Sequence, residues 1–291
     1  MNNTSPILIP RPDRPVDPLF LSVIREIHKA SRAFGFPVFV VGAVARIILL
    51  ENVFNLKLRR TTSDVDFAFA LDNWEQFKEI RNFLISNAGF EEDKDRIHRL
   101  LLKLPGLEHK AKVDLIPFGG IAGSSNTIAW PPDMDMLMNV AGFGDALAAA
   151  YSVEVEPGIT IPVASLPGLT VLKLFAWADR RMENSKDAID FVTLLRSYHE
   201  AGNDNRIYEE PKALAALEAT GFDIELGGAW LLGHDVALMI SADTNEALKA
   251  LLTGTKRMRL IEDMGRAMRG RVDALDYSNR LLEQFTDGFT A

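Results

Sequence analysis

The stretch that decides the fold is Arg60-Thr-Thr-Ser-Asp-Val-Asp-Phe67, followed by Ala-Phe-Ala-Leu. Apolar side chains alternate from Val65 to Leu71, which predicts a half-buried β-strand. Asp64 and Asp66 occupy its other face, and the strand rise places their Cα atoms roughly 6–7 Å apart. Two carboxylates at this spacing can share a pair of cations, and their hard oxygens suit Mg²⁺ or Mn²⁺. The alternative interpretation is that both aspartates simply face solvent.

A possible phosphate-binding turn precedes this stretch. Residues 36–41 indicate a short strand that stops at Gly42, and a helix is expected over residues 43–51. A turn from strand to helix exposes backbone N–H groups at the start of the helix, where phosphate binds well.

A third carboxylate follows further along the chain. Asp114 alternates with apolar neighbours in an expected strand over residues 110–116. It faces the same side of a sheet as Asp64 and Asp66 if the two strands are neighbours. A phosphate turn with three strand carboxylates is typical of two-metal phosphoryl transfer, in which the third carboxylate helps to bind and deprotonate the attacking hydroxyl.

Composition restricts the class of protein. The chain has 291 residues, of which 47% are hydrophobic and 25% are charged, as in ordinary globular proteins. It has no cysteine, which excludes disulfides, cysteine zinc sites, iron–sulfur clusters and thiol catalysis. No apolar run approaches the ~20 residues of a membrane span, and the first residues lack the order of a signal peptide. We therefore expect a soluble, cytoplasmic protein with no membrane contact.

The charge balance bears on nucleic-acid binding. Acidic residues outnumber basic ones by 40 to 32, giving a net charge of −8, so any RNA contact requires a local basic patch. Residues 244–272 are the best candidate, with seven basic side chains against three acidic ones. A solvated helix face explains this pattern equally well, and the segment has no aromatic side chain for base stacking.

The order of the expected elements predicts an α+β fold. Five prolines within the first 18 residues indicate an extended arm. Strands dominate the chain up to residue 164, and helices dominate from residue 165 onward. We therefore expect a catalytic domain over residues 1–164, with a mixed sheet flanked by helices, and a helical domain over residues 165–291. Helices of that domain are expected near residues 167–181, 187–200, 211–220, 225–240, 244–252 and 256–268.

Two charged pairs mark the start of the helical half. Lys173 and Arg180 lie on one face of an apolar helix, where two cations could clamp a triphosphate, although surface cations with buried stems explain the spacing too. Asp187 and Asp190 share a face of the next helix, where they could instead complement the helix dipole. A second Asp-x-Asp, Asp133 to Asp135, follows two prolines and precedes an expected helical run, so we interpret it as structural.

Together these residues resemble a known superfamily. The strand–Gly turn, the segment 60–66 and Asp114 are similar to the pattern of the DNA polymerase β type nucleotidyltransferases. Residues 166–180 with 186–191, and also 230–237, look like segments of the AbiEii/AbiGii-type toxin nucleotidyltransferases. The resemblance implies Asp64, Asp66 and Asp114 as metal-binding and catalytic acids. It further implies Gly42, Ala43, Ser63, Lys173 and Arg180 as nucleotide-binding residues, with Asp187 or Asp190 completing the acidic motif.

The resemblance also implies an activity. The protein would use Mg²⁺ or Mn²⁺ and an NTP to move a nucleoside monophosphate to an acceptor hydroxyl. It would be the toxin of a toxin–antitoxin pair, with tRNA as acceptor and a cognate antitoxin as partner. Ala43 stands where the pattern usually has Gly or Ser, and the gap from Gly42 to Asp64 is longer than usual. Two alternatives therefore stay open: transfer to a small molecule of the antibiotic type, and a nucleotide-binding module without catalysis.

Overall fold

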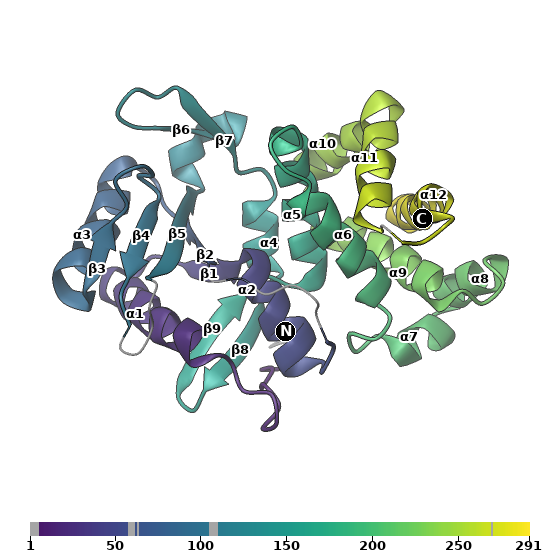
Figure 1. Cartoon of the computed structure of the whole chain (residues 1–291), viewed down its shortest axis with the longest axis horizontal. Helices are drawn as coiled ribbons and strands as arrows, with labels where there is room; N and C mark the ends of the chain where they lie inside the picture. Colours follow the sequence, from purple (N-terminus) through teal and green to yellow (C-terminus); the bar gives the residue numbers. More distant parts are fainter. Residues whose placement is uncertain (1–5, 58–61, 63, 105–109, 269) are drawn as a thin grey trace. The chain divides into compact units, whose positions relative to one another are not determined.

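The computed structural model describes residues 6–57, 62, 64–104, 110–268 and 270–291 of the chain. The chain divides into two compact units, the first ending at Ser165 and the second beginning at Leu166 (Figure 1). The first unit contains all strands of the described residues, and the second contains helices only. The overall class is therefore α+β, as the sequence predicts.

The first unit is built around a seven-stranded mixed sheet with the order β3-β4-β5-β2-β1-β9-β8. Strands β2 and β5 run parallel, as do β1 and β9, whereas the other neighbours are antiparallel. A separate hairpin consists of β6 and β7. The strands are β1 (Val38–Val41), β2 (Asp64–Ala70), β3 (Phe90–Glu92), β4 (Arg99–Leu102), β5 (Ala111–Phe118), β6 (Thr127–Trp130), β7 (Met136–Asn139), β8 (Tyr151–Glu156) and β9 (Ile159–Val163).

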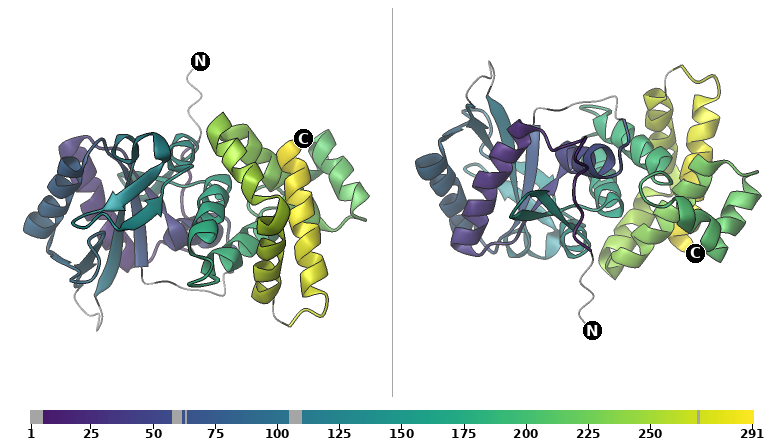
Figure 2. Two further views of the ribbon diagram at one scale, coloured as in Figure 1. Left: turned by 90° about the horizontal axis from the view of Figure 1, so that it is seen from above. Right: turned by 90° about the horizontal axis from the view of Figure 1, so that it is seen from below.

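Local sequence explains where the helices of this unit begin and end. The side chain of Asp17 accepts a hydrogen bond from the N–H of Leu19 and caps α1 (Pro18–Phe34), which ends at Gly35 in the left-handed conformation. Asn73 caps α3 (Trp74–Ala88) in the same way. The two helices lie side by side against the sheet (Figure 2), where Phe34 of α1 and Phe83 of α3 meet edge to face at 5.6 Å.

Helix α4 (Phe143–Ala148) packs on the opposite face of the sheet from α1 and α3. Its Phe143 contacts the rings of Phe39 and Phe118, with centroids 6.4 and 5.6 Å away. Phe39 pairs with Ala68 in the register, so this aromatic cluster lies on the face of β2 that carries the aspartates. Apolar packing thus closes one end of the face on which Asp64 and Asp66 lie.

Several element predictions need correction. The helix expected over residues 43–51 is α2 (Gly42–Ile47) followed by a π-helical segment, η1 (Ile48–Val53). A short 3₁₀ helix, η2 (Gly120–Ser125), follows β5. The run after Asp135 is strand β7 rather than a helix, because it pairs with β6. The strands β8 and β9 were not predicted, although residues 151–163 alternate between buried and partly exposed.

The second unit is a bundle of helices. They are α5 (Leu166–Arg180), α6 (Lys186–Ser197), α7 (Asp204–Glu209), α8 (Pro211–Ala219), α9 (Ile224–Met239), α10 (Ala242–Leu251), α11 (Gly254–Ala267) and α12 (Ala274–Thr290). The six predicted helices are present, whereas α7 and α12 were not predicted. Helices α11 and α12 lie side by side (Figure 2). Of the helices in the described part of the chain, none combines the length and apolarity that crossing a membrane demands.

Two glycines allow helices α9 and α12 to pack closely in this bundle. A Cβ on Gly233 of α9 would lie 2.0 Å from the carbonyl oxygen of Phe285, and a Cβ on Gly288 of α12 would lie 1.9 Å from that of Trp230. Both distances are far below van der Waals contact, so α9 and α12 approach each other closely only because these positions have no side chain.

Candidate active site

Three aspartates share one face of the central sheet. Asp66 lies opposite Val41 of β1 and directly beside Asp114 of β5, and residues aligned in this way point to the same side. Asp64 lies two residues before Asp66 on β2 and therefore points the same way. The parallel pairing of β2 with β5 is what brings Asp114, far away in sequence, next to the aspartate pair.

Gly42 brings the backbone against Asp66. The residue has φ +67°, and a Cβ built on it would lie 2.0 Å from Oδ2 of Asp66. Only glycine fits this position, both because of its conformation and because of the lack of space. Ala43 follows in the first turn of α2, and Val41 offers no capping side chain for the N–H groups of that turn. Ser63, the other predicted phosphate contact in this unit, lies outside the described residues.

The sequence analysis missed one charged residue at this site, Arg99. It is the first residue of β4 and pairs with Asp114 in the register. Its Nε donates to Oδ1 of Asp114 at 2.6 Å, and its Nη2 donates to Oδ2 at 2.8 Å. The same Nη2 lies 3.9 Å from Oδ2 of Asp64. The hydrogen bonds to Asp114 raise the pKa of Arg99 against the opposing effect of burial.

The donor chemistry of the site suits a hard divalent cation. Asp64 and Asp66 are partly buried carboxylates on one face of a strand, and carboxylate oxygens are the ligands that such an ion prefers. The oxygens of Asp114 both accept hydrogen bonds from Arg99, and within the described stretches no group of three acidic or histidine side chains is arranged to hold a metal. The chemistry and spacing of the aspartate pair on β2 therefore make it the candidate cation ligand of this site.

The predicted residues of the second unit form a separate buried network. Nζ of Lys173 lies 3.1 Å from Oδ1 of Asp187 and 2.7 Å from Oδ2 of Asp190. Arg180 donates from Nε to Oδ2 of Asp187 at 2.7 Å and from Nη2 to Oδ1 at 3.0 Å. Two cations and two carboxylates therefore compensate each other, and both aspartate side chains are 2% exposed.

The pKa values reflect this compensation. Burial disfavours the charged form of Lys173, but Asp190 and Asp187 outweigh it, so the pKa of Lys173 lies above its ordinary value. Burial likewise opposes the ionisation of Asp187, yet its hydrogen bonds with Arg180 and the charge of Lys173 hold the pKa of Asp187 below its ordinary value. Lys173 and Asp187 are therefore both charged at neutral pH.

Three of the six described basic side chains in the segment 244–272 are engaged in local ion pairs. Lys249 pairs with Glu246, Arg266 with Asp263, and Arg271 with Asp273. Arg269 lies outside the described residues. The remaining basic side chains are in the first turns of α11 and have no ion-pair partner in the described part of the chain; they are Lys256, Arg257 and Arg259.

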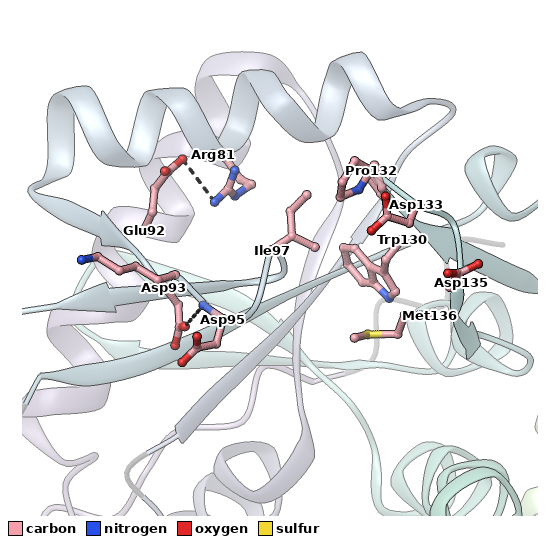
Figure 3. A pocket seen from close by; sticks show the side chains of 12 residues that line it. Arg81, Glu92, Asp93, Asp95, Ile97, Trp130, Pro132, Asp133, Asp135 and Met136 are labelled. Carbon is pink, nitrogen blue, oxygen red and sulfur yellow. Dashed lines mark hydrogen bonds and ion pairs between the residues drawn. The ribbon is translucent and has the colours of Figure 1, made fainter.

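A pocket of about 570 Å³ lies elsewhere in the first unit, between α3, the β3–β4 turn and the β6–β7 turn (Figure 3). Trp130 and Ile97 supply apolar surface to it, and acidic side chains outnumber basic ones in its lining. Asp133 and Asp135 of the second Asp-x-Asp line this pocket on a turn rather than on a strand. None of the three sheet aspartates lines it, so it is distinct from the site around Asp66.

The class of protein follows from sequence comparison. The chain has a mixed sheet that carries an aspartate pair beside a glycine turn, and helices follow it. The sequence matches the profile of the family described as "Nucleotidyl transferase AbiEii toxin, Type IV TA system" over residues 49–287. The chain belongs to this family. The match includes Asp64, Asp66 and Asp114, and it begins after Gly42.

Solved structures with a similar arrangement have low sequence identity to the chain. The antibiotic-resistance factor ANT(2'')-Ia matches at TM-score 0.38 and 16% identity, over 69% of this chain and 97% of that one. A nucleotidyltransferase-like protein from Paracoccidioides brasiliensis matches at TM-score 0.41 and 15% identity, over 74% and 95%. A CCA-adding enzyme in complex with ATP matches at TM-score 0.32 and 14% identity, over 94% and 67%. No curated protein sequence matches the chain.

Proposed function

We propose that the chain transfers a nucleoside monophosphate from an NTP to a hydroxyl group of an RNA, with tRNA as the acceptor, as the toxin of a toxin–antitoxin pair. The observation that carries this proposal is the register of Asp66 with Asp114 beside the glycine turn at Gly42. This juxtaposition supplies the acidic groups that nucleotidyl transfer requires within one small area of the sheet. Family membership supports the toxin role and, through it, an antitoxin partner.

Each residue of the first unit has a distinct role in this proposal. Asp64 and Asp66 hold Mg²⁺ or Mn²⁺, which when bound neutralises the phosphate charge and polarises the transferred phosphoryl group. Asp114 accepts the proton of the acceptor hydroxyl, whose oxygen then attacks the α-phosphorus. The bond from that phosphorus to the bridging oxygen breaks, and pyrophosphate leaves. The N–H groups that follow Gly42, including that of Ala43, bind phosphate oxygens, as does Ser63.

The family resemblance extends this proposal to two cations of the helical unit. Lys173 and Arg180 bind the NTP phosphates in this proposal, and Asp187 and Asp190 hold both cations in place until the nucleotide arrives. Both aspartates contact Lys173, which supports a part for each of them in positioning this lysine. A phosphate that binds Lys173 competes with these carboxylates for its three N–H donors.

The proposed reaction is tested by incubating the protein with each of the four NTPs, labelled on the α-phosphate, together with Mg²⁺ and total tRNA. We expect label to appear on RNA with the wild-type protein and to disappear with Asp64→Asn, because that change removes a charged cation ligand. Asp95→Asn is the matched control, since Asp95 lies on the exposed turn between β3 and β4. Label on a small acceptor but on no RNA would contradict the choice of acceptor and favour antibiotic-type transfer. Tight NTP binding without transfer to any acceptor would contradict catalysis altogether.

A further inference from the structure

We propose that Arg99 is a positioning residue of this site, which orients Asp114 as the proton acceptor and sets the charge that a divalent cation meets. The inference rests on the function proposed above and assigns a role to a residue outside the acidic motif. In this proposal Arg99 contacts neither the NTP nor the acceptor hydroxyl. It acts through its contact with Asp114 and, more weakly, through its contact with Asp64.

The geometry of the Arg99–Asp114 pair fixes the carboxylate in one orientation. Two parallel N–H···O hydrogen bonds, at 2.6 and 2.8 Å, join the planar guanidinium to both oxygens of Asp114. The side chains are 10% and 14% exposed, so water competes little with this contact. A carboxylate held at both oxygens cannot rotate about its Cβ–Cγ bond without breaking a hydrogen bond. Its remaining lone pairs therefore keep a constant direction on the face shared with Asp66.

The position of Arg99 also determines the charge of the site. Its Nη2 lies between Asp114 and Asp64, 2.8 Å from the first carboxylate and 3.9 Å from the second. The three carboxylates and the guanidinium of Arg99 together carry a formal charge of −2, which one divalent cation balances. Without Arg99 the charge would be −3, and Asp114 would be free to turn toward the cation as an additional ligand. The guanidinium thus keeps Asp114 oriented to accept the proton of the acceptor hydroxyl, while Asp64 and Asp66 bind the cation.

A purely structural role, in which the ion pair only joins β4 to β5, makes different predictions. The chain offers a matched control for that role in Arg25, which pairs with both oxygens of Glu156 in the same unit at 2.6 and 2.5 Å. Arg25→Met removes an equivalent bidentate pair that lies on α1 and β8, away from the aspartates. Arg99→Met removes guanidinium and charge together, whereas Arg99→Lys keeps the charge and loses the bidentate geometry.

The experiment first measures Mn²⁺ binding to each variant without NTP or acceptor, by electron paramagnetic resonance of the free ion. We expect Arg99→Met to bind Mn²⁺ roughly tenfold more tightly than wild type, because a nearby positive charge has been removed. Arg99→Lys should bind it as the wild type does, and so should Arg25→Met. A comparison of Mn²⁺ binding by the wild type and by Asp64→Asn tests the proposed cation site separately. The proposed function and the role of Arg99 can therefore fail independently.

Turnover with the NTP and acceptor then tests the orientation of Asp114. We expect kcat to fall roughly 10- to 100-fold in both Arg99 variants, with the KM for NTP unchanged, as for residues that orient a reacting group. Wild-type kcat in Arg99→Lys would overturn the orienting role, and unchanged Mn²⁺ affinity in Arg99→Met would overturn the charge role. If Arg99→Met does not fold, Arg99→Gln removes the same positive charge, keeps a hydrogen-bond donor for the buried carboxylate of Asp114, and carries the Mn²⁺ measurement.

Discussion

Gly42 shows how a single backbone position can determine the geometry of the carboxylates. Its φ of +67° is costly for any other residue, and the space for a Cβ is already taken by the carboxylate of Asp66. Gly35 has nearly the same conformation, with φ +72°, but nothing lies within 4 Å of a Cβ built there. A comparison of substitutions at the two glycines therefore separates the effect of backbone strain from the effect of a collision with Asp66.

We expect Gly42→Ala to abolish nucleotidyl transfer and Gly35→Ala to leave it unchanged. Both variants should lose about 1–2 kcal/mol of stability, since each places alanine in the left-handed region. Only Gly42→Ala must also displace Asp66, and with it a proposed cation ligand. The measurements are label transfer and urea denaturation of the two variants side by side. Equal activity of the variants would show that Asp66 can move without consequence.

The functional role of a residue can be predicted from the sequence when the local pattern marks that residue. It cannot be predicted when the role depends on a partner far away in the sequence. Asp64 and Asp66 are recognisable because they alternate with buried apolar residues, and Gly42 because it ends a strand. Arg99 looks like one of many charged residues until β4 is paired with β5. Its role depends on strand order, because the register brings it opposite Asp114, and strand order is not contained in local spacing.

Helices α5 and α6 are connected by a buried network of charges, which makes their stability depend on pH. The folded-state pKa of Asp187 is depressed, so its contribution is present above its unfolded-state pKa, about 3.9, and is lost as the pH falls through the folded-state value. Removing one member of such a network leaves the other charges buried without compensation.

We expect Asp187→Asn to lower the free energy of unfolding of the second unit by about 3 kcal/mol at pH 7. This deficit should shrink as the pH falls below the unfolded-state pKa of about 3.9 toward the lower folded-state pKa of Asp187, because the unfolded wild-type chain takes up a proton on Asp187 before the folded one does. Amide hydrogen exchange in α5 and α6 reports this unit separately from the sheet. Asp287→Asn, on the exposed side of α12, serves as the control and should show no such trend. A deficit that stayed constant with pH would contradict the network.

Helices and strands were predicted correctly where one hydrophobic period dominates the sequence. They were missed where pairing with another strand determines the secondary structure. The strong alternation of apolar residues in β2 was sufficient to identify this strand. The strand β7 follows prolines and has exposed Met136 and Leu137, so only its pairing with β6 makes it a strand. Helix α12 had a usable signal in its regularly spaced buried residues, which are Tyr277, Leu281, Leu282, Phe285 and Phe289.

At the scale of the whole molecule, a net charge of −8 opposes an RNA substrate. Binding then depends on places where cations are not already paired with carboxylates. Lys256, Arg257 and Arg259 at the start of α11 are such a place among the described residues. Their position near a helix N-terminus is unfavourable for cations, so helix stability does not explain them.

We expect the combined change of Lys256, Arg257 and Arg259 to glutamine to weaken tRNA binding and to lower its dependence on salt. Each lost phosphate contact should reduce the slope of log K against log salt concentration by about 0.7–0.9. The measurement is filter binding between 50 and 200 mM salt, which are roughly the limits of the useful range. Lys249→Gln is the control, because Lys249 is already paired with Glu246. An unchanged slope would place the RNA contact elsewhere.

The parallel pairing of β2 with β5 has a consequence for the timing of synthesis. Two parallel neighbours need a long crossover, here residues 71–110, before the second strand can join the first. A nascent chain therefore displays Asp64 and Asp66 well before Asp114 has left the ribosome. A product terminated ahead of Ala111 would carry both proposed cation ligands but not the strand with the proposed proton acceptor. Under the proposed toxin function, we expect such a fragment to be harmless to the cell that makes it.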